Sequence, residues 1–258
     1  IVPARIEAPF NDAAQEVVAA TRTDARRGQR LAIGAEFNAV DRRVVAHVTS
    51  SHGNFVRDEY GRRIEGFGEE ARRIVAAGLD EGLGRDDIAD ALEQAARAVL
   101  IERAPFYWET VAASFIAQGR SYAQMSSYAE AGIRQYRIEA VLDEQTTNIC
   151  RYLHGKTFLV ADALRRFDRI EQLEDPEAIK QAMPWVREAQ DRETGRTRLY
   201  VDGGGGRTDL AEVTRSAMGP RDDRGDFRAL ASDSALNEVG IGFPPYHGLC
   251  RSTTLAVV

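Results

Sequence analysis

The apolar residues change their period at Ile133, and this change constrains the fold more than any other feature of the 258-residue sequence. Before it, apolar side chains recur at three- and four-residue spacing, which is typical of helices. After it, they occupy alternate positions, which is typical of a half-buried strand. These positions are Tyr136, Ile138, Ala140 and Leu142. We therefore predict an α+β chain, with a helical region over residues 1–132 and a small α+β C-terminal module over 133–258 that contains a short sheet.

Several helices are expected in the helical region. Glu16–Thr21 and Ala35–His47 carry small and apolar residues at helical spacing. Residues 66–101 predict a helical hairpin whose first helix is ended by glycines. These glycines are Gly78, Gly82 and Gly84. A further helix over residues 105–132 begins at its proline, and Gly119 is expected to break it.

The C-terminal module is expected to contain two more strands and a long insertion. The β-branched and apolar segments are Lys156–Val160 and Arg251–Val258. The insertion spans residues 161–240 and is rich in charge. Two short helices and a glycine turn are predicted within it, at residues 165–173, 176–190 and Gly203–Gly206.

Composition excludes some classes of protein. The chain is 43 % hydrophobic and 29 % charged, as expected for a globular protein that buries a core. Its net charge of −6 argues against a general electrostatic grip on nucleic acid. No run approaches the roughly 20 apolar residues that span a bilayer, so we expect no membrane-spanning segment. The start of the sequence also lacks the basic and apolar regions of a signal peptide, and none is expected.

Both cysteines and two of the four histidines fall into two short segments. Cys150 and His154 are four residues apart, so on a helix they share one face. His247 and Cys250 lie in a loop whose approach is stiffened by prolines. These prolines are Pro244 and Pro245. Two thiolates and two imidazoles suit tetrahedral zinc, and such a site would clamp the two ends of the module together.

Other chemistries fit the same four residues. Cys150 and Cys250 can be ordinary buried thiols, with the histidines bonded to the backbone. They can instead form a disulfide between the two segments, or one of them can pair with a histidine as a nucleophile. We expect the four residues to converge under any of these chemistries, and to form a structural clamp rather than a catalytic site.

A second cluster of polar residues lies just before Cys150. Asp143, Thr146 and Thr147 provide side-chain oxygens that suit the start of a helix over residues 144–154. Arg151 is expected to bond the Asp143 carboxylate or the C-terminal strand. Arg251 is placed in the same network. We interpret this cluster as structural rather than catalytic.

Two segments of the sequence together resemble the C-terminal signature of the phage Mu F-like head morphogenesis family. The first signature segment is residues 141–158 and the second is residues 244–254. In the first, the matching residues are Asp143, Glu144, Thr146, Cys150, Arg151, Leu153, Gly155, Lys156 and Phe158. In the second, they are Pro244, Pro245, His247, Cys250 and Arg251. The resemblance covers roughly residues 105–258, and Gly248 stands where the family often has proline.

The resemblance implies a structural minor capsid protein and not an enzyme. Such a protein is located in the virion, at the portal vertex or the capsid interior, and in the host cytoplasm during assembly. Its implied partners are the portal protein and the major capsid protein, with contact to packaged DNA and a role in DNA packaging or delivery. The helical region is expected to bind portal or capsid.

Two alternative functions stay open from the sequence. One is a toxin-like enzyme, a nuclease or related effector, built on the C-terminal module. The other is a binding module of a mobile-element protein that never enters a virion. An open pocket with a solvent-accessible metal position, or a perturbed acid–base pair, would favour the enzyme.

Overall fold

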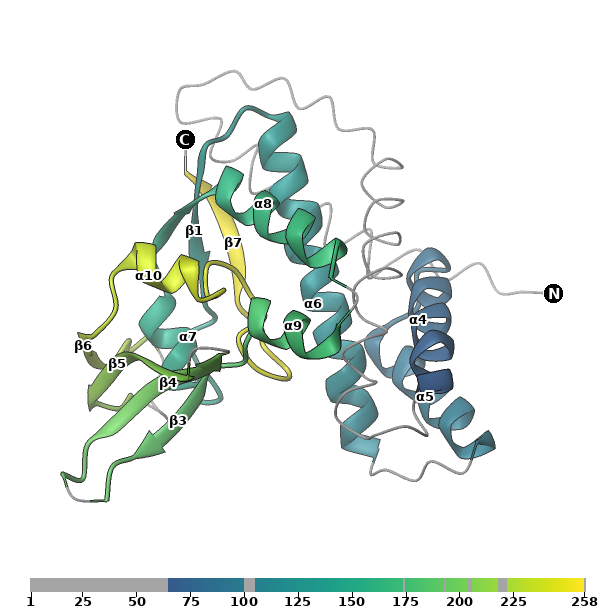
Figure 1. Cartoon of the computed structure of the whole chain (residues 1–258), viewed down its shortest axis with the longest axis horizontal. Coiled ribbons are helices and arrows are strands. Elements are labelled where there is room, and N and C mark those ends of the chain that lie inside the picture. Colours follow the sequence, from purple (N-terminus) through teal and green to yellow (C-terminus); the bar gives the residue numbers. More distant parts are fainter. Residues whose placement is uncertain are drawn as a thin grey trace.

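The computed structural model describes residues 65–99, 105–173, 175–192, 194–203, 206–217 and 222–257. Described helices come first, and strands occur only from Gln135 onward, so the α+β prediction is confirmed. Figure 1 shows two helices on one side of a long central helix and both sheets on the other side. The predicted helices at Glu16–Thr21 and Ala35–His47 lie outside the described residues.

The predicted helical hairpin is present as α4 (Glu65–Asp80) and α5 (Arg85–Ala98). The chain turns between them at Gly82, which has a positive φ of 72°. Gly78 was predicted to end this helix, but it lies inside α4. Its Cα approaches Ile88 of α5 so closely that a Cβ there would lie 2.7 Å from the Ile88 side chain. The small residue therefore permits close helix packing instead of ending the helix.

Helix α6 (Pro105–Glu130) is continuous, so the break predicted at Gly119 is wrong. Gly119 is buried in the middle of α6. The two halves of α6 pack in two different cores, and this packing outweighs the roughly 1 kcal/mol by which glycine disfavours a helix. The first half of α6 shares a core with α4 and α5 through Trp108 and Phe115. Its second half shares the core of the C-terminal module through Met125 and Tyr128. None of the described helices, α6 included, is long and apolar enough to cross a membrane.

The predicted short sheet is formed by residues far apart in the sequence. Its strands are β1 (Gln135–Glu139), β2 (Thr157–Leu159) and β7 (Thr253–Val257). Strand β1 lies in the centre and pairs antiparallel with both others, so that Tyr136 stands opposite Phe158 and Ala256. The short helix α7 (Asn148–Leu153) joins β1 to β2 and buries its apolar residues in the same core.

The insertion contains a second sheet that the sequence did not predict. It follows two short helices, α8 (Val160–Glu171) and α9 (Pro176–Ala182). The second of these ends well before residue 190, where the prediction placed its end. The sheet is antiparallel in the order β3 (Arg187–Gln190), β4 (Thr197–Gly203), β5 (Gly206–Arg215) and β6 (Asp226–Ala229). A last short helix, α10 (Asp233–Glu238), follows it.

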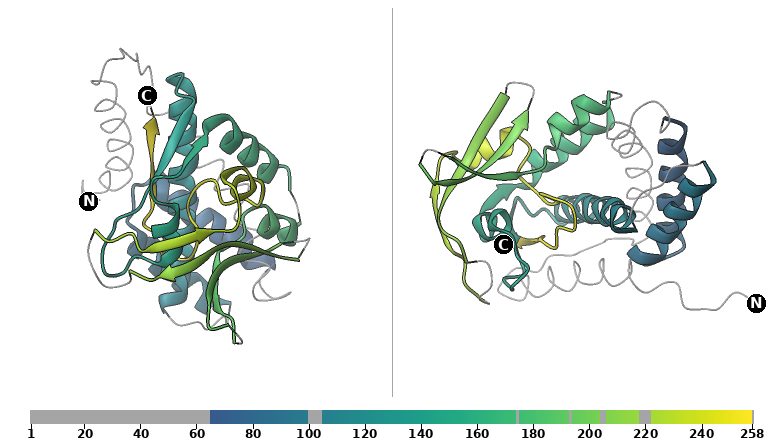
Figure 2. Two further views of the ribbon diagram at one scale, coloured as in Figure 1. Left: turned by 90° about the vertical axis from the view of Figure 1, so that its left-hand side faces the viewer. Right: turned by 90° about the horizontal axis from the view of Figure 1, so that it is seen from below.

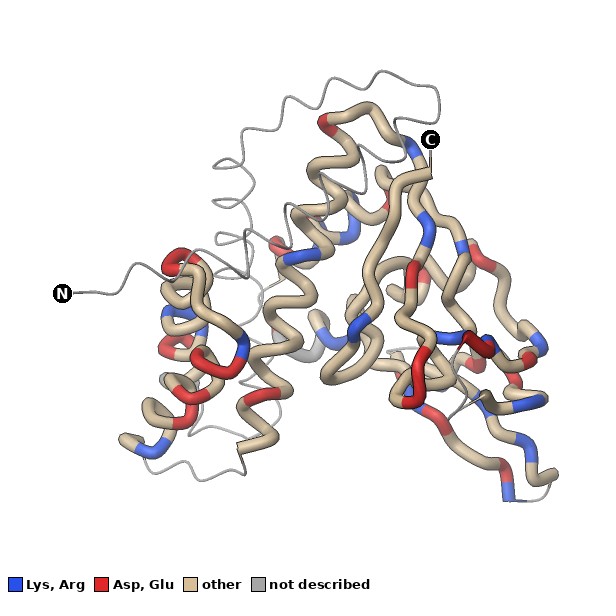
Figure 3. Tube along the Cα trace, turned by 180° about the vertical axis from the view of Figure 1, so that it is seen from behind, with Lys and Arg blue, Asp and Glu red and all other residues tan. Residues whose placement is uncertain are grey.

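The four-stranded sheet is polar in sequence because it exposes one face. Leu199, Val201 and Ala211 are buried in the module core. Charged residues pair across neighbouring strands, with Arg198 Nη1 2.5 Å from Asp209 Oδ2. Acidic and basic residues are interspersed along this sheet and along α4 and α5 (Figure 3). Because charged residues stand between the buried apolar ones, this part of the sequence appears polar and its strands are hard to recognise.

Helix α6 connects the helical region to the C-terminal module, and lies between them in the right-hand view of Figure 2. Polar side chains on its buried face bond the end of the chain. Ser121 Oγ donates to the Pro244 carbonyl at 2.7 Å, and Tyr128 OH donates to the Thr254 carbonyl at 2.9 Å. Gln124 exchanges hydrogen bonds with the side chains of Thr253 and Thr254. The second signature segment is thereby held against α6.

The backbone at Gly240 should tolerate no side chain. Gly240 has a φ of 89°, and a Cβ there would lie 2.4 Å from the Ala182 carbonyl oxygen. We expect Gly240→Ala to lower the free energy of unfolding by about 2–3 kcal/mol, from backbone strain and displacement of the α9 end. Gly132 is the matched control, because its φ is also positive at 70° but nothing lies within 4 Å. Gly132→Ala should cost about 1 kcal/mol in urea unfolding, and an equal effect of both substitutions would contradict the packing described.

Candidate metal centre

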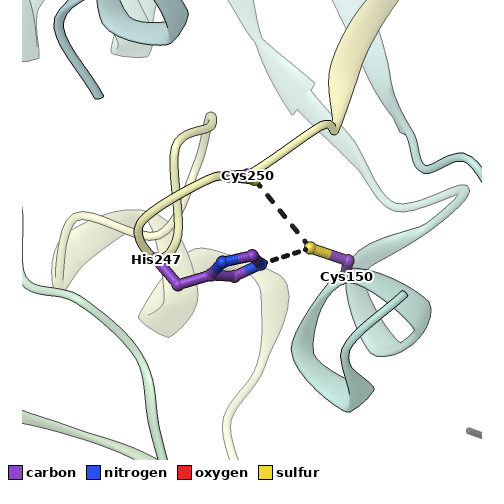
Figure 4. Close-up of side chains that lie close together, drawn as sticks. All are labelled: Cys150, His247 and Cys250. Carbon is purple, nitrogen blue, oxygen red and sulfur yellow. Dashed lines mark hydrogen bonds between the residues drawn. The ribbon is translucent and has the colours of Figure 1, made fainter. Parts of the chain in front are cut away.

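Cys150, His247 and Cys250 form one compact group (Figure 4). Cys150 lies on α7, whose neighbouring Ile149 and Leu153 anchor the helix in the module core. His247 and Cys250 lie in the loop that leads into β7. Cys150 is 3 % exposed, and the other two are partly buried. The group therefore joins the two signature segments at the point where β7 begins.

The three side chains are spaced as ligands of one ion. Cys150 Sγ lies 3.1 Å from His247 Nε2 and 3.9 Å from Cys250 Sγ. All three ligand atoms lie within 4.8 Å of one another. Two thiolates at about 2.3 Å from a tetrahedral zinc are about 3.8 Å apart, close to the distance seen here. The sulfurs are too far apart for a disulfide bond, and both cysteines are free. The group can therefore hold a metal ion.

Hydrogen bonds orient the His247 ring toward the sulfurs. Its Nδ1 lies 2.6 Å from the Gly248 carbonyl oxygen, which can only accept. The proton is therefore assigned to Nδ1, and the lone pair of Nε2 faces Cys150 Sγ and Thr147 Oγ1, each at 3.1 Å. A backbone carbonyl that fixes one ring nitrogen while the other faces an ion is the usual arrangement of metal-binding histidines.

His154 is not part of this group, contrary to the prediction of four converging ligands. Helix α7 ends at Leu153, and His154 has a non-helical ψ of 126°. Its φ of −54° and its N–H bond to the Cys150 carbonyl still follow the helix, so the backbone spacing does not explain why its ring lies outside the group. The His154 Nδ1 instead accepts the backbone N–H of Ala140 at 3.1 Å. Burial lowers the pKa of His154 below its ordinary value, which favours the neutral ring that accepts this bond.

The pKa values of the two thiols in this group shift in opposite directions. The hydrogen bond between the sulfurs, together with burial, raises the pKa of Cys150 well above its ordinary value. The same bond, assisted by His247, holds the pKa of Cys250 well below its ordinary value. Burial opposes protonation of His247, but its contact with Cys250 and its bond to the Gly248 carbonyl together raise the His247 pKa. The shared hydrogen bond thus couples the ionisation of the two thiols.

A second link between the signature segments is an ion pair. Arg251 donates from both terminal nitrogens to the Asp143 carboxylate, at 2.7 and 2.6 Å. The prediction that Asp143 caps α7 is wrong. Its Oδ1 instead accepts from the Gln145 N–H and from Thr146 Oγ1 in the turn before the helix. Thr147 occupies the N-cap position, but its side chain makes no capping bond and faces His247.

Arg151 is fully buried and bonds backbone carbonyl groups. Its Nε donates to the Thr146 carbonyl at 3.0 Å, and its terminal nitrogens donate to the carbonyls of Asp143 and Asp223. The predicted bond to the Asp143 carboxylate is thus replaced by one to the Asp143 main chain, because Arg251 occupies that carboxylate. Arg151 ties the first signature segment to the turn before β6, which the sequence did not predict.

The remaining motif residues shape the backbone around the group. Gly155 has a positive φ of 81° and donates its N–H to the Ile138 carbonyl at 2.8 Å. Lys156 Nζ lies 2.6 Å from Asp233 Oδ1 and 4.7 Å from the centre of the Tyr152 ring. Pro244 and Pro245 are joined by a cis peptide bond, and the Pro244 carbonyl is bonded by α6.

The loop that carries His247 also packs directly on α6. A Cβ at position 248 would lie 2.5 Å from Thr110 Cγ2 and 3.6 Å from the Trp185 ring. Glycine is therefore required at this position by packing, where the Mu F-like family often has proline. The polar residues of α6 that bond this loop and β7 were missed from the sequence. Their spacing of three and four residues, at Ser121, Gln124 and Tyr128, is a signal that could have identified a bonded helix face.

The Asp143–Arg251 pair predicts a pH dependence of stability. The hydrogen bond from Arg251, and then that from Thr146, hold the pKa of Asp143 well below its ordinary value of 3.8. A depressed pKa stabilises the fold above the unfolded-state pKa, and this contribution is lost as the pH falls through the folded-state pKa. We therefore expect Asp143→Asn to destabilise the chain by a constant amount at neutral pH, with the difference shrinking below about pH 4.

Urea unfolding of both proteins across this pH range measures that difference. The Arg251→Gln variant lacks the ion-pair partner of Asp143. Adding Asp143→Asn to this variant should change its free energy of unfolding much less than in the wild type. A difference that grows toward low pH would contradict the role of this ion pair.

Comparison of the chain with protein-family models, with curated proteins and with solved structures returned no match. The likeness to the Mu F-like family rests on the two signature segments.

Proposed function

We propose that the chain is a structural minor head protein of a tailed phage or phage-like particle and acts in head morphogenesis. The observation that supports this function is the meeting of the two signature segments. Cys150 contacts His247 and lies near Cys250, and Asp143 pairs with Arg251. The residues that resemble the family therefore work together as one clamp across the C-terminal module.

Zinc is the metal that we propose for this clamp. Thiolate sulfur and imidazole nitrogen together favour zinc over the hard cations magnesium and calcium, which prefer oxygen. The ligands come from α7 and from the loop before β7, so an ion bound there would fasten the last strand to the rest of the module. Metal binding that joins distant segments contributes directly to folding stability.

The proposed partners follow from the same resemblance. The helical region would bind the portal protein or the major capsid protein, and the chain would lie at the portal vertex or inner capsid face, in contact with packaged DNA. It would reside in the host cytoplasm before assembly.

Mass spectrometry of purified particles tests this function. We expect the chain to co-purify with particles of the phage or prophage that encodes it, at a few copies per portal. Quantification against the portal protein gives the stoichiometry, and particles treated with nuclease and high salt exclude loose adsorption. Absence from particles, or a copy number near that of the major capsid protein, would contradict a minor head role.

One observation favours the enzyme alternative. A small pocket lies beside Cys150 and His247, as a metal-dependent hydrolase would require. Among the described residues that line it, none is an aspartate or glutamate that could serve as a general base. A nuclease assay of the zinc-loaded chain tests this alternative. Turnover that disappears in Cys250→Ser, while the fold is retained, would support the enzyme.

A further inference from the structure

The metal group leaves one corner of a tetrahedral site without a protein ligand. Zinc takes four ligands in structural sites, and three with one open position in catalytic sites. The described residues supply three, from Cys150, His247 and Cys250. The residue nearest in sequence that could supply a fourth is His154, and its Nδ1 is engaged by the Ala140 N–H.

A pocket borders two of the three ligands. It is lined by Cys150 and His247, and also by Thr147, Arg251 and Ser252. Its volume of about 20 Å³ has room for one water molecule, which needs at least 10–15 Å³. The pocket is thus of the size of a single small ligand beside the metal group.

Ser252 presents a buried hydroxyl to the pocket, beside Cys150. Its side chain is buried, at 7 % exposure, and its Oγ bonds no oxygen or nitrogen of the described residues, with only the Cys150 thiol beside it. Sulfur is a weak hydrogen-bond partner, so this hydroxyl can still bond a stronger one. A water or anion in the pocket would satisfy this hydroxyl. The Arg251 guanidinium also lines the pocket, and its charge is shared with the Asp143 carboxylate.

We propose that the metal held by Cys150, His247 and Cys250 carries a fourth, exchangeable ligand in this pocket, which is water or a small monoanion. This inference rests on the zinc clamp proposed above. It extends the clamp from a closed structural site to one that binds an external ligand. It includes no reaction, since the described residues that line the pocket provide no carboxylate base.

Cobalt(II) substitution of the full chain tests the proposal with two separate measurements. Visible absorption first reports whether cobalt binds with thiolate ligands, and titration with azide then reports whether a ligand can exchange. We expect thiolate-to-cobalt absorption in the wild type, and a saturable change of the ligand-field bands with azide. Ser252→Ala should keep the cobalt spectrum and weaken azide binding about 5-fold, as for loss of one hydrogen bond.

His154→Ala is the control for a closed site. If His154 moves in to become the fourth ligand, the wild-type spectrum will not respond to azide and the His154→Ala spectrum will, which would overturn the proposal. Equal azide responses in both proteins support it. Cobalt bands that ignore azide in every variant overturn the exchangeable position but leave the metal clamp standing. An absence of thiolate–cobalt absorption overturns the clamp and this inference together.

Discussion

Removing the metal should lower the thermal unfolding midpoint of the chain by about 8–16 °C. A ligand present at a thousand times its dissociation constant stabilises the folded state by about 4.1 kcal/mol. For a chain of this size, each kcal/mol moves the midpoint by roughly 2–4 °C. The effect is large because the ion would join α7 to the loop before β7, two segments that are about 100 residues apart in sequence. Thermal unfolding with and without a chelator measures it.

Two variants make this prediction specific to the three ligands. Cys250→Ser should unfold at the lower midpoint and lose its response to the chelator. His154→Ala should keep the full response, because His154 bonds the Ala140 backbone and lies outside the group. A chelator response that disappears in His154→Ala, or that persists in Cys250→Ser, would show that a different set of residues holds the metal.

Replacing Arg151 with methionine should lower the free energy of unfolding by about 3–5 kcal/mol. Arg151 is completely buried, and its guanidinium donates to three carbonyl groups in two separate turns. Methionine fills much of the same space but donates no hydrogen bond, so the carbonyls of Asp143, Thr146 and Asp223 lose this donor inside the protein. Urea unfolding, with the slope checked for two-state behaviour, gives the difference.

Arg251 provides the matched control for Arg151. Both are arginines of the signature segments, but the side chain of Arg251 is 46 % exposed and its partner is the Asp143 carboxylate. Exposed ion pairs contribute about 0–1 kcal/mol, so Arg251→Gln should have a small effect. Similar losses in the two variants would mean that charge, and not the buried carbonyl bonds, explains the role of Arg151.

The period change at Ile133 predicted strand β1, and the β-branched and apolar segments Lys156–Val160 and Arg251–Val258 predicted β2 and β7. Strand β1 alternates clearly, with Tyr136 and Ile138 buried and Arg137 and Glu139 partly exposed, and β7 is β-branched and apolar. The four-stranded sheet could not be predicted in this way. Its strand β5 buries three consecutive residues, Leu210, Ala211 and Glu212, around a shift in register. Charged residues that pair across the strands conceal the remaining alternation.

Three of the four metal ligands predicted from the sequence lie together in the structure. Convergence of Cys150, His247 and Cys250 required only that the two signature segments meet. His154 keeps a helical φ at the end of α7, but its ring accepts the Ala140 N–H just after β1. A bond of this kind cannot be predicted from spacing along the helix, because it depends on which segment lies beside the helix end. The carbonyl bonds of Arg151 were missed because they involve main-chain atoms of distant turns.

Native mass spectrometry of the intact chain tests the metal clamp most directly. It separates the three chemistries of the cysteine pair by mass, because bound zinc adds one ion, a disulfide removes two hydrogens and free thiols change nothing. We expect the wild type and His154→Ala to carry one zinc per folded chain, and Cys250→Ser to carry none. A wild-type chain without zinc after purification in zinc-containing buffer, or one that has lost two hydrogens, would contradict the clamp.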